Sequence, residues 1–435
     1  MERSSKTVAF MILSVFILSL SVTGIAQADA ETDARIQKLE AALEALQAEI
    51  AELKAEKTKE SAPVDQALID TMVAEAVKTQ KESISGVPDW VNRIKLSGDF
   101  RYRHESTDTE SDNRWIKGRN RHRIRGRLGV SAQVTDEWDV FFRLATGSAD
   151  PVSSNQTLTE SFSTKDFRLD RAYFDWHPNA VEGLNIFGGK MKNPFYTPLK
   201  TELIWDGDLN PEGIAAKYVL PLSDKTSLTL DGGGFWVQYD KYDVDLSLWG
   251  AQTILDHKLD DKSYLRGGVS YYDYGNIQGA ASLESTFDDG SDFFGNTSTD
   301  DDTFANDYNL LELFGEYGFK VGSMPFALTG DYVKNTAADS GKDTAWLIGC
   351  AINKAKDAGS WRARYNYRET QADAVVGLFS DSDFGGGDTD SKGHEIGFDY
   401  MISKNVMGSL SYFLNEVGRE DEEIRKLQAD IIFKF

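Results

Sequence analysis

The chain has 435 residues and a formal net charge of −23, and this acidic excess argues against a nucleic-acid-binding protein. Cys350 is its one cysteine, which excludes an intramolecular disulfide and therefore a disulfide-stapled secreted fold. Only 40% of the residues are hydrophobic, yet the chain has 24 Phe, 17 Tyr and 37 Gly, a combination that suits strands with one apolar side.

The first segment predicts export. Basic Arg3 and Lys6 precede an apolar run over Val8–Val22, and Ala26–Ala28 has the small-x-small pattern of a cleavage site. We therefore expect residues 1–28 to be a signal peptide; an uncleaved anchor helix is the alternative. No later stretch approaches the roughly 18 uncharged residues that a membrane-spanning helix needs.

A heptad repeat follows and predicts a short α-helical coiled coil over residues 29–60. The a and d positions are Ile36, Leu39, Leu43, Leu46, Ile50 and Leu53. In a parallel assembly Arg35 would face Glu40, and Glu49 would face Lys54, so self-association is favoured over the alternative of a lone amphipathic helix. Residues 61–89 form a helical linker that ends in a Gly-Val-Pro turn.

From residue 90 to 435 the hydrophobic period changes to two, which predicts an all-β transmembrane barrel of about 16 antiparallel strands. In the first strand, Ile94–Arg103, apolar and charged residues alternate throughout. The further expected strands are Arg121–Val134, Trp138–Thr146, Asp166–Trp176, Leu184–Met191, Gly213–Leu220, Leu228–Val237, Leu246–Leu255, Leu265–Tyr274, Leu311–Phe319, Phe326–Val333, Trp346–Asn353, Trp361–Arg368, Glu395–Ile402, Val406–Leu414 and Lys426–Phe435.

The connections between these strands alternate between short turns and long loops, as in bacterial outer-membrane barrels. The long ones are His104–Lys117, Gly147–Lys165, Gly275–Asn306 and Thr370–His394. Aromatic residues gather near strand ends and predict two interfacial girdles, with the outer surface in contact with lipid. The girdle residues are Trp138, Trp176, Trp361, Tyr102, Tyr271, Tyr367 and Tyr412.

Arginines occupy alternate positions on the polar faces of several strands, where a barrel would direct them into a water-filled lumen. The expected pore-lining residues are Arg101, Arg103, Arg121, Arg123, Arg125, Arg127, Arg143, Arg171, Arg362, Arg364 and Arg368. Permanent, weakly hydrated charges in such a row attract anions. The compatible structural alternative is that inward or loop carboxylates neutralise them.

Three stretches resemble the putative-porin family of Gram-negative outer membranes, which joins an N-terminal coiled coil to a barrel. They are Leu169–Pro178 (LDRAYFDWHP), Gly189–Phe195 (GKMKNPF) and Asp381–His394 (DSDFGGGDTDSKGH). The second stretch also has a looser likeness to anion-selective porins. The resemblance implies passive diffusion of small hydrophilic solutes or ions, a location in the outer membrane with the coiled coil in the periplasm, and commonly a trimer, although Ile at a with Leu at d leans towards dimers.

The resemblance also implies two roles for particular residues. In sixteen-stranded porins the loop after the fifth strand folds inward, so Lys192–Pro211 would form a constriction; a surface loop is the alternative. Its expected constriction residues are Glu202, Trp205, Asp206 and Asp208. The terminal Phe435 closes an amphipathic last strand of the kind that outer-membrane assembly machinery reads.

Nothing in the sequence predicts catalysis, a cofactor or a metal. The five histidines are far apart, and neither HExxH nor G-x-S-x-G occurs. Acidic runs in Gly275–Asn306 and around Asp381 and Asp383 lack calcium-motif spacing, so solvated loops are expected there. A barrel hydrolase and a tether between the outer membrane and the cell wall are the alternative functions.

Overall fold

The computed structural model describes residues 89–435 except 112–113, 240–243, 287–290 and 419–421. The predicted signal peptide, the coiled coil and all but the last residue of the linker lie outside the described residues. The described chain begins with one short helix, α4 (Asp89–Asn92), ahead of the first strand. No helix among the described residues is long and apolar enough to cross a membrane.

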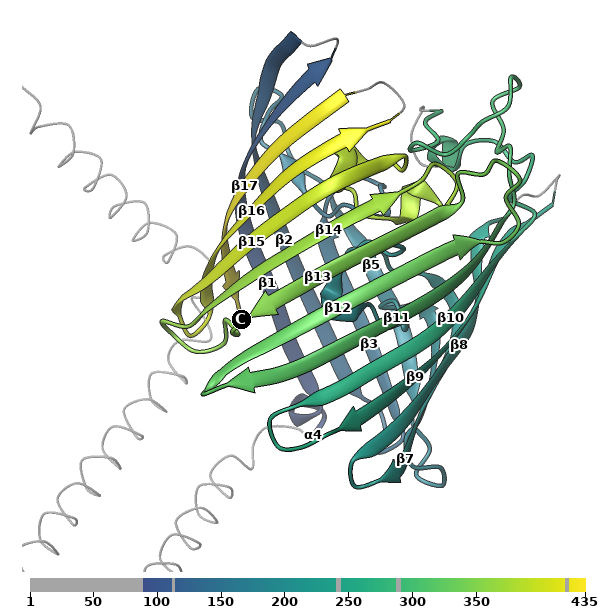
Figure 1. Cartoon of the computed structure of the whole chain (residues 1–435). Helices are drawn as coiled ribbons and strands as arrows, with labels where there is room; N and C mark the ends of the chain where they lie inside the picture. The colour runs from purple at the N-terminus through teal and green to yellow at the C-terminus, as the bar shows by residue number, and fades with distance from the viewer. Residues whose placement is uncertain (1–88, 112–113, 240–243, 287–290, 419–421) are drawn as a thin grey trace, which may run out of the picture. The chain divides into compact units, whose positions relative to one another are not determined.

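The strands of the described chain form one antiparallel sheet that closes on itself, because β1 pairs with both β2 and β17. Figure 1 shows this closure, where the yellow C-terminal strands meet the purple-blue N-terminal ones. Sixteen strands make the ring, and the two-residue β4 (Gln156–Thr157) pairs with the middle of β2 from within a loop. The prediction of a barrel of about 16 antiparallel strands is therefore confirmed.

Each predicted strand coincides with one strand of the ring. The ring strands are β1 (Ile94–Ser111), β2 (Arg114–Gln133), β3 (Trp138–Thr146), β5 (Phe167–Trp176), β6 (Leu184–Lys190), β7 (Glu212–Ser223), β8 (Thr226–Gln238), β9 (Leu246–Lys258), β10 (Tyr264–Gly275), β11 (Tyr308–Val321), β12 (Met324–Asn335), β13 (Thr344–Ile352), β14 (Trp361–Thr370), β15 (Ser391–Ser403), β16 (Val406–Val417) and β17 (Glu422–Lys434).

One predicted loop was wrong. The segment expected as a long loop, His104–Lys117, is mostly a strand-paired hairpin, because β1 and β2 stay paired, across one register shift between Thr107 and Thr109, as far as Ser111 and Arg114. The chain there is rich in polar Ser, Thr and Asp, so the apolar alternation ends before the pairing does. β-Branched Thr favours extended backbone even without an apolar face, which allows the hairpin to continue beyond the apolar part of the barrel.

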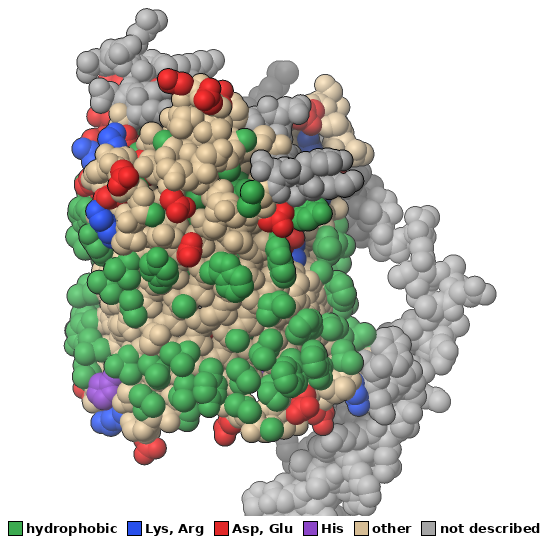
Figure 2. Space-filling view, turned by 90° about the vertical axis from the view of Figure 1, so that its right-hand side faces the viewer, with side chains coloured by type: hydrophobic (Ala, Val, Ile, Leu, Met, Phe, Trp, Pro, Cys, Tyr) green, Lys and Arg blue, Asp and Glu red, His purple; other side chains and the backbone are tan. Residues whose placement is uncertain are grey.

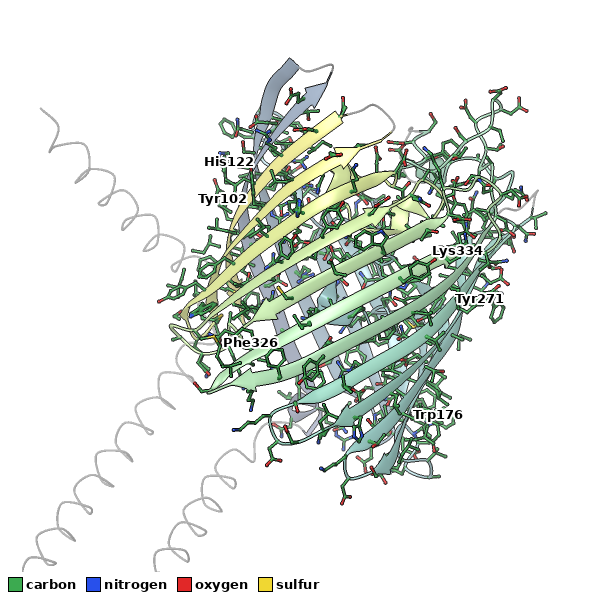
Figure 3. The ribbon with its side chains drawn as sticks, in the orientation of Figure 1. Tyr102, His122, Trp176, Tyr271, Phe326 and Lys334 are labelled. Carbon is green, nitrogen blue, oxygen red and sulfur yellow. The ribbon has the colours of Figure 1, made fainter. Side chains whose placement is uncertain are left out.

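The outer wall of the barrel is apolar. Phe100 is 40% exposed, whereas its chain neighbour Arg101 is only 9% exposed, as expected where alternate side chains face outward and inward. Figure 2 shows hydrophobic side chains in bands around the wall and acidic ones at its upper and lower edges. Rings mark both rims: Trp138 stacks on Trp176 with centroids 5.5 Å apart at the short-turn rim, and Tyr102 lies towards the other (Figure 3).

An inner hydrophobic core lies inside the ring, on the side of strands β7 to β13. It joins inward residues of those strands, such as Tyr272 and Leu310, to residues of four long loops that fold against them. Phe195 from one of these loops packs on β9, where Gly250 leaves room for it; a Cβ at this glycine would lie 2.4 Å from the ring. These loops therefore fill part of the lumen, and their positions determine how much open space remains.

Candidate functional site

The predicted arginines lie on the inward face of the barrel. In the β1–β2 ladder, Arg101 is opposite Arg125 and Arg103 is opposite Arg123, and Arg143 of β3 is opposite Arg171 of β5. Cross-strand neighbours on one face are only about 5 Å apart at Cβ, so like charges placed this way repel unless anions intervene. A row of this kind is therefore stable only with nearby carboxylates.

Such carboxylates are present. Asp99 of β1 accepts hydrogen bonds from Arg125 at 2.9 Å and from Arg127 at 2.6 Å. Arg103 donates to Asp430 of β17 at 2.8 Å and to Asp383 of a loop at 3.2 Å. The predicted arginines of β1, β2, β3 and β5, here called the arginine row, are thus held by charge-assisted hydrogen bonds. These bonds are stronger than neutral ones and fix the direction of each guanidinium.

Three of the predicted arginines lie on β14. Arg362 and Arg364 both pair with Asp399 of β15, and Arg368 pairs with Asp381. In the described chain, the carboxylates within 4.0 Å of the eleven predicted arginines are Asp99, Glu105, Asp170, Asp208, Asp381, Asp383, Glu395, Asp399 and Asp430. Eleven positive charges against nine negative ones leave a surplus of two positive charges.

The loop over residues 191–211 crosses the interior of the ring. At one end Asp208 accepts from Arg127 of β2 at 3.2 Å. Further back, the Tyr196 hydroxyl donates to Glu316 of β11 at 2.6 Å, and the Leu199 N–H donates to the same carboxylate at 3.2 Å. Strands β2 and β11 are eight places apart in the ring of sixteen, so one loop bonds to opposite walls of the barrel.

Trp205 of the crossing loop packs against the barrel wall. It is 3% exposed and meets Tyr272 of β10 edge-on, with ring centroids 5.0 Å apart. Its ring is buried in the inner hydrophobic core and anchors the loop to the barrel wall. Burying this large aromatic ring is more favourable than exposing it to a water-filled lumen. The other three predicted constriction residues are the loop's carboxylates, Glu202, Asp206 and Asp208.

Two of these carboxylates, Glu202 and Asp206, meet Asp381 of a second loop, with oxygens of all three within 4.8 Å of one another. Backbone bonds join the loops here, since the Asp206 N–H donates to the Phe379 carbonyl at 2.8 Å. Burial and neighbouring carboxylates raise the pKa values of Glu202 and Asp206 well above the ordinary carboxyl range.

Asp208 differs from them. Burial alone would raise its pKa, but Arg125 and Arg127 outweigh that effect and lower the pKa of Asp208 to about 2. It is therefore the loop's permanent negative charge, and it faces the arginine row.

Sequence reasoning missed most of the partners that hold the arginines. Asp99 shares the inward face of β1 with Arg101, so the alternation itself is a signal that identifies it. Asp381 and Asp383 were expected in a solvated loop, which is wrong, because both pair with lumen cations, the latter also lying 3.5 Å from Lys426 of β17. No local pattern predicts contacts between residues 280 positions apart.

The comparisons with known proteins agree with this architecture. The family model described as "Putative porin" matches residues 115–313 and 303–435. The chain belongs to this porin family. Its barrel is similar to Pseudomonas putida OprB in a high-pH structure, with a TM-score of 0.53 and 10% identity over 80% of this chain and 96% of that chain.

Salmonella typhi OmpF, in a complex with daunomycin, also matches, with a TM-score of 0.49 and 12% identity over 79% of this chain and 97% of that chain. At 10% identity the likeness to OprB shows the fold alone. The sequence has no match among curated proteins.

Proposed function

We propose that this porin-family chain is a passive outer-membrane channel for small hydrophilic solutes or ions, narrowed by the loop over residues 191–211. The observation that carries the proposal is that this loop bonds to β2 on one side and to β11 on the other. A segment spanning the lumen leaves a path whose width depends on it. Such a channel works through charge and shape and needs no catalytic residue.

The path lies between the arginine row and the crossing loop. The positive charge of the arginine row and the negative charge of Asp208 on the crossing loop produce a field that orients dipolar solutes and disfavours apolar ones. The surplus of two positive charges near the arginines favours anions there, whereas the acidic outer loops favour cations at the mouth.

Oligomerisation, targeting and assembly complete the proposal. We infer a homotrimer in the outer membrane, with the N-terminal coiled coil in the periplasm and Phe435 as the residue that assembly machinery reads. The Gly98 N–H donates to the Phe435 carbonyl at 2.9 Å, so the last residue completes the β1–β17 seam. Phe435→Ala is expected to lower the amount of heat-modifiable barrel in outer-membrane fractions.

Liposome swelling tests the proposed function. Vesicles that contain the refolded full chain are diluted into iso-osmotic solutions of neutral solutes of increasing size, and the rate of swelling is followed by turbidity. We expect fast swelling with the smallest solutes and a steep decline with size, because the loop narrows the lumen. Equal rates in empty vesicles and in vesicles with folded barrel would contradict an open channel.

A further inference from the structure

Two adjoining cavities lie beside the crossing loop, lined by residues of β3, β5, β6, β7, β8 and β9 and of the loops between strands. The larger has a volume of about 750 Å³, and its lining mixes apolar residues with polar and charged ones. The smaller has a volume of about 170 Å³ and a mostly apolar lining. The residues that border both are Pro151, Lys190, Asn210, Glu212, Val237 and Phe379.

The smaller cavity is an aromatic pocket. Its walls include the rings of Phe195, Trp205, Phe235 and Phe379. An apolar cavity of about 150 Å³ holds one benzene molecule, so a volume of about 170 Å³ suits one six-membered ring.

The larger cavity has an excess of negative charge. Asp150, Asp170, Asp208 and Glu212 line it with Arg168 and Lys190, four acidic groups against two basic ones. Three of these acidic groups already pair with cations: Asp170 with Arg143, Asp208 with Arg127, and Glu212 with Lys190.

Asp150 is different from the other three. The Val152 N–H donates to it at 2.9 Å, and in the described chain no Lys or Arg nitrogen lies within 4.0 Å of its carboxylate. Burial raises the pKa of Asp150, which is the expected sign for a carboxylate without a close cation. Asp150 lines the larger cavity, and its chain neighbour Pro151 borders both cavities.

We propose that the two cavities form one binding site for a solute with a single aromatic ring and a protonated amine on a short chain. The ring fills the aromatic pocket, and the ammonium group pairs with Asp150. This assignment deepens the proposed channel function by naming a solute class, and the binding itself does not depend on conduction.

Titration calorimetry at low ionic strength on the folded, detergent-solubilised full chain tests the site with three probes. Tyramine carries the ring, the hydroxyl and the ammonium; ethylamine lacks the ring; 3-(4-hydroxyphenyl)propionate replaces the ammonium with a carboxylate. We expect tyramine to bind at least about tenfold more tightly than either control, from ring burial and charge pairing respectively. Equal affinities, a tighter carboxylate probe, or no tyramine binding by folded protein would overturn the proposal.

Two variants locate the binding. Asp150→Asn changes a half-buried loop residue and is expected to weaken tyramine binding about tenfold, leaving ethylamine binding equally weak. Val237→Trp fills the aromatic pocket and is expected to abolish ring-dependent binding; heat-modifiable gel mobility shows whether this variant folds. Asp300→Asn, at an exposed outer-loop position, is the matched control and should bind like the wild type. Unchanged binding in folded Asp150→Asn would overturn the site, whether or not the chain conducts.

Discussion

Replacing Asp208 with Asn removes the one crossing-loop carboxylate whose pKa is lowered, to about 2. This carboxylate lies 3.2 Å from Arg127 and 3.8 Å from Arg125. The asparagine side chain has the same shape and keeps an acceptor for the Ser154 hydroxyl, which donates to Asp208 at 2.8 Å. The change is therefore chiefly one of charge: the positive surplus around the arginines rises from two to three.

The size of the effect follows from Coulomb's law. For an ion passing at about 6 Å in water, one charge contributes about 0.7 kcal/mol, or about 0.4 kcal/mol after screening at 0.1 M salt. That is roughly a twofold gain for anions and a twofold loss for cations. Asp208→Asn should thus shift the anion-to-cation permeability ratio about fourfold towards anions, and more if the lumen is less polar than water.

The reversal potential in a KCl gradient across a planar bilayer measures this ratio. Asp136→Asn makes the same change in an exposed short turn and should leave the potential at the wild-type value. If Asp208→Asn shifts the potential no further than this control, or shifts it towards cations, then Asp208 does not border the ion path and our placement of the constriction is wrong.

Three further predictions concern the loop's attachment. Trp205→Ala should cost about 3–5 kcal/mol of unfolding free energy, measured by denaturant titration, and should raise single-channel conductance; wild-type values for both would refute the anchor. Gly250→Ala should lower the melting temperature by forcing the Phe195 ring away, whereas Gly232→Ala, whose Cβ would have its nearest neighbour at 3.6 Å, should not; equal melting temperatures would contradict this packing.

The third prediction concerns pH. The raised pKa of Glu202 means that its neutral form stabilises the loop contact in acid, and that this contribution is lost as the pH rises through the raised value. Current noise should then increase with pH in the wild type and less so in Glu202→Gln; identical pH profiles would refute the assignment.

The barrel was predictable because a membrane wall imposes a period of two on every strand. Trp138–Thr146 was predicted with its exact ends, since a turn and a polar loop bound a clean alternation there. The same signal failed at His104–Lys117, where the hairpin continues through polar residues. Alternation of apolar and polar residues arises where a strand faces lipid. It therefore does not predict strand pairing that extends beyond the apolar wall.

The site was predictable only in part. The alternation of side chains along each strand was enough to predict that the arginines point inward. The path of Lys192–Pro211 came from family resemblance, because residue types do not tell an inward loop from an outward one. Trp205 shows the reason: Asp206 follows it directly, yet its ring is packed against Tyr272, which is 67 positions away in the chain. Contacts between residues so far apart in the sequence form only when the barrel closes, so no local sequence pattern predicts them.

Current through a planar bilayer containing the wild-type full chain is the most direct test of a channel narrowed by a crossing loop and lined by arginines. We predict stepwise conductance and, in a KCl gradient, a reversal potential that favours chloride. Correctly folded protein that carries no current would contradict the open lumen. Stepwise conductance with a clear cation preference would contradict control of selectivity by the arginine row and would assign that control to the acidic outer loops.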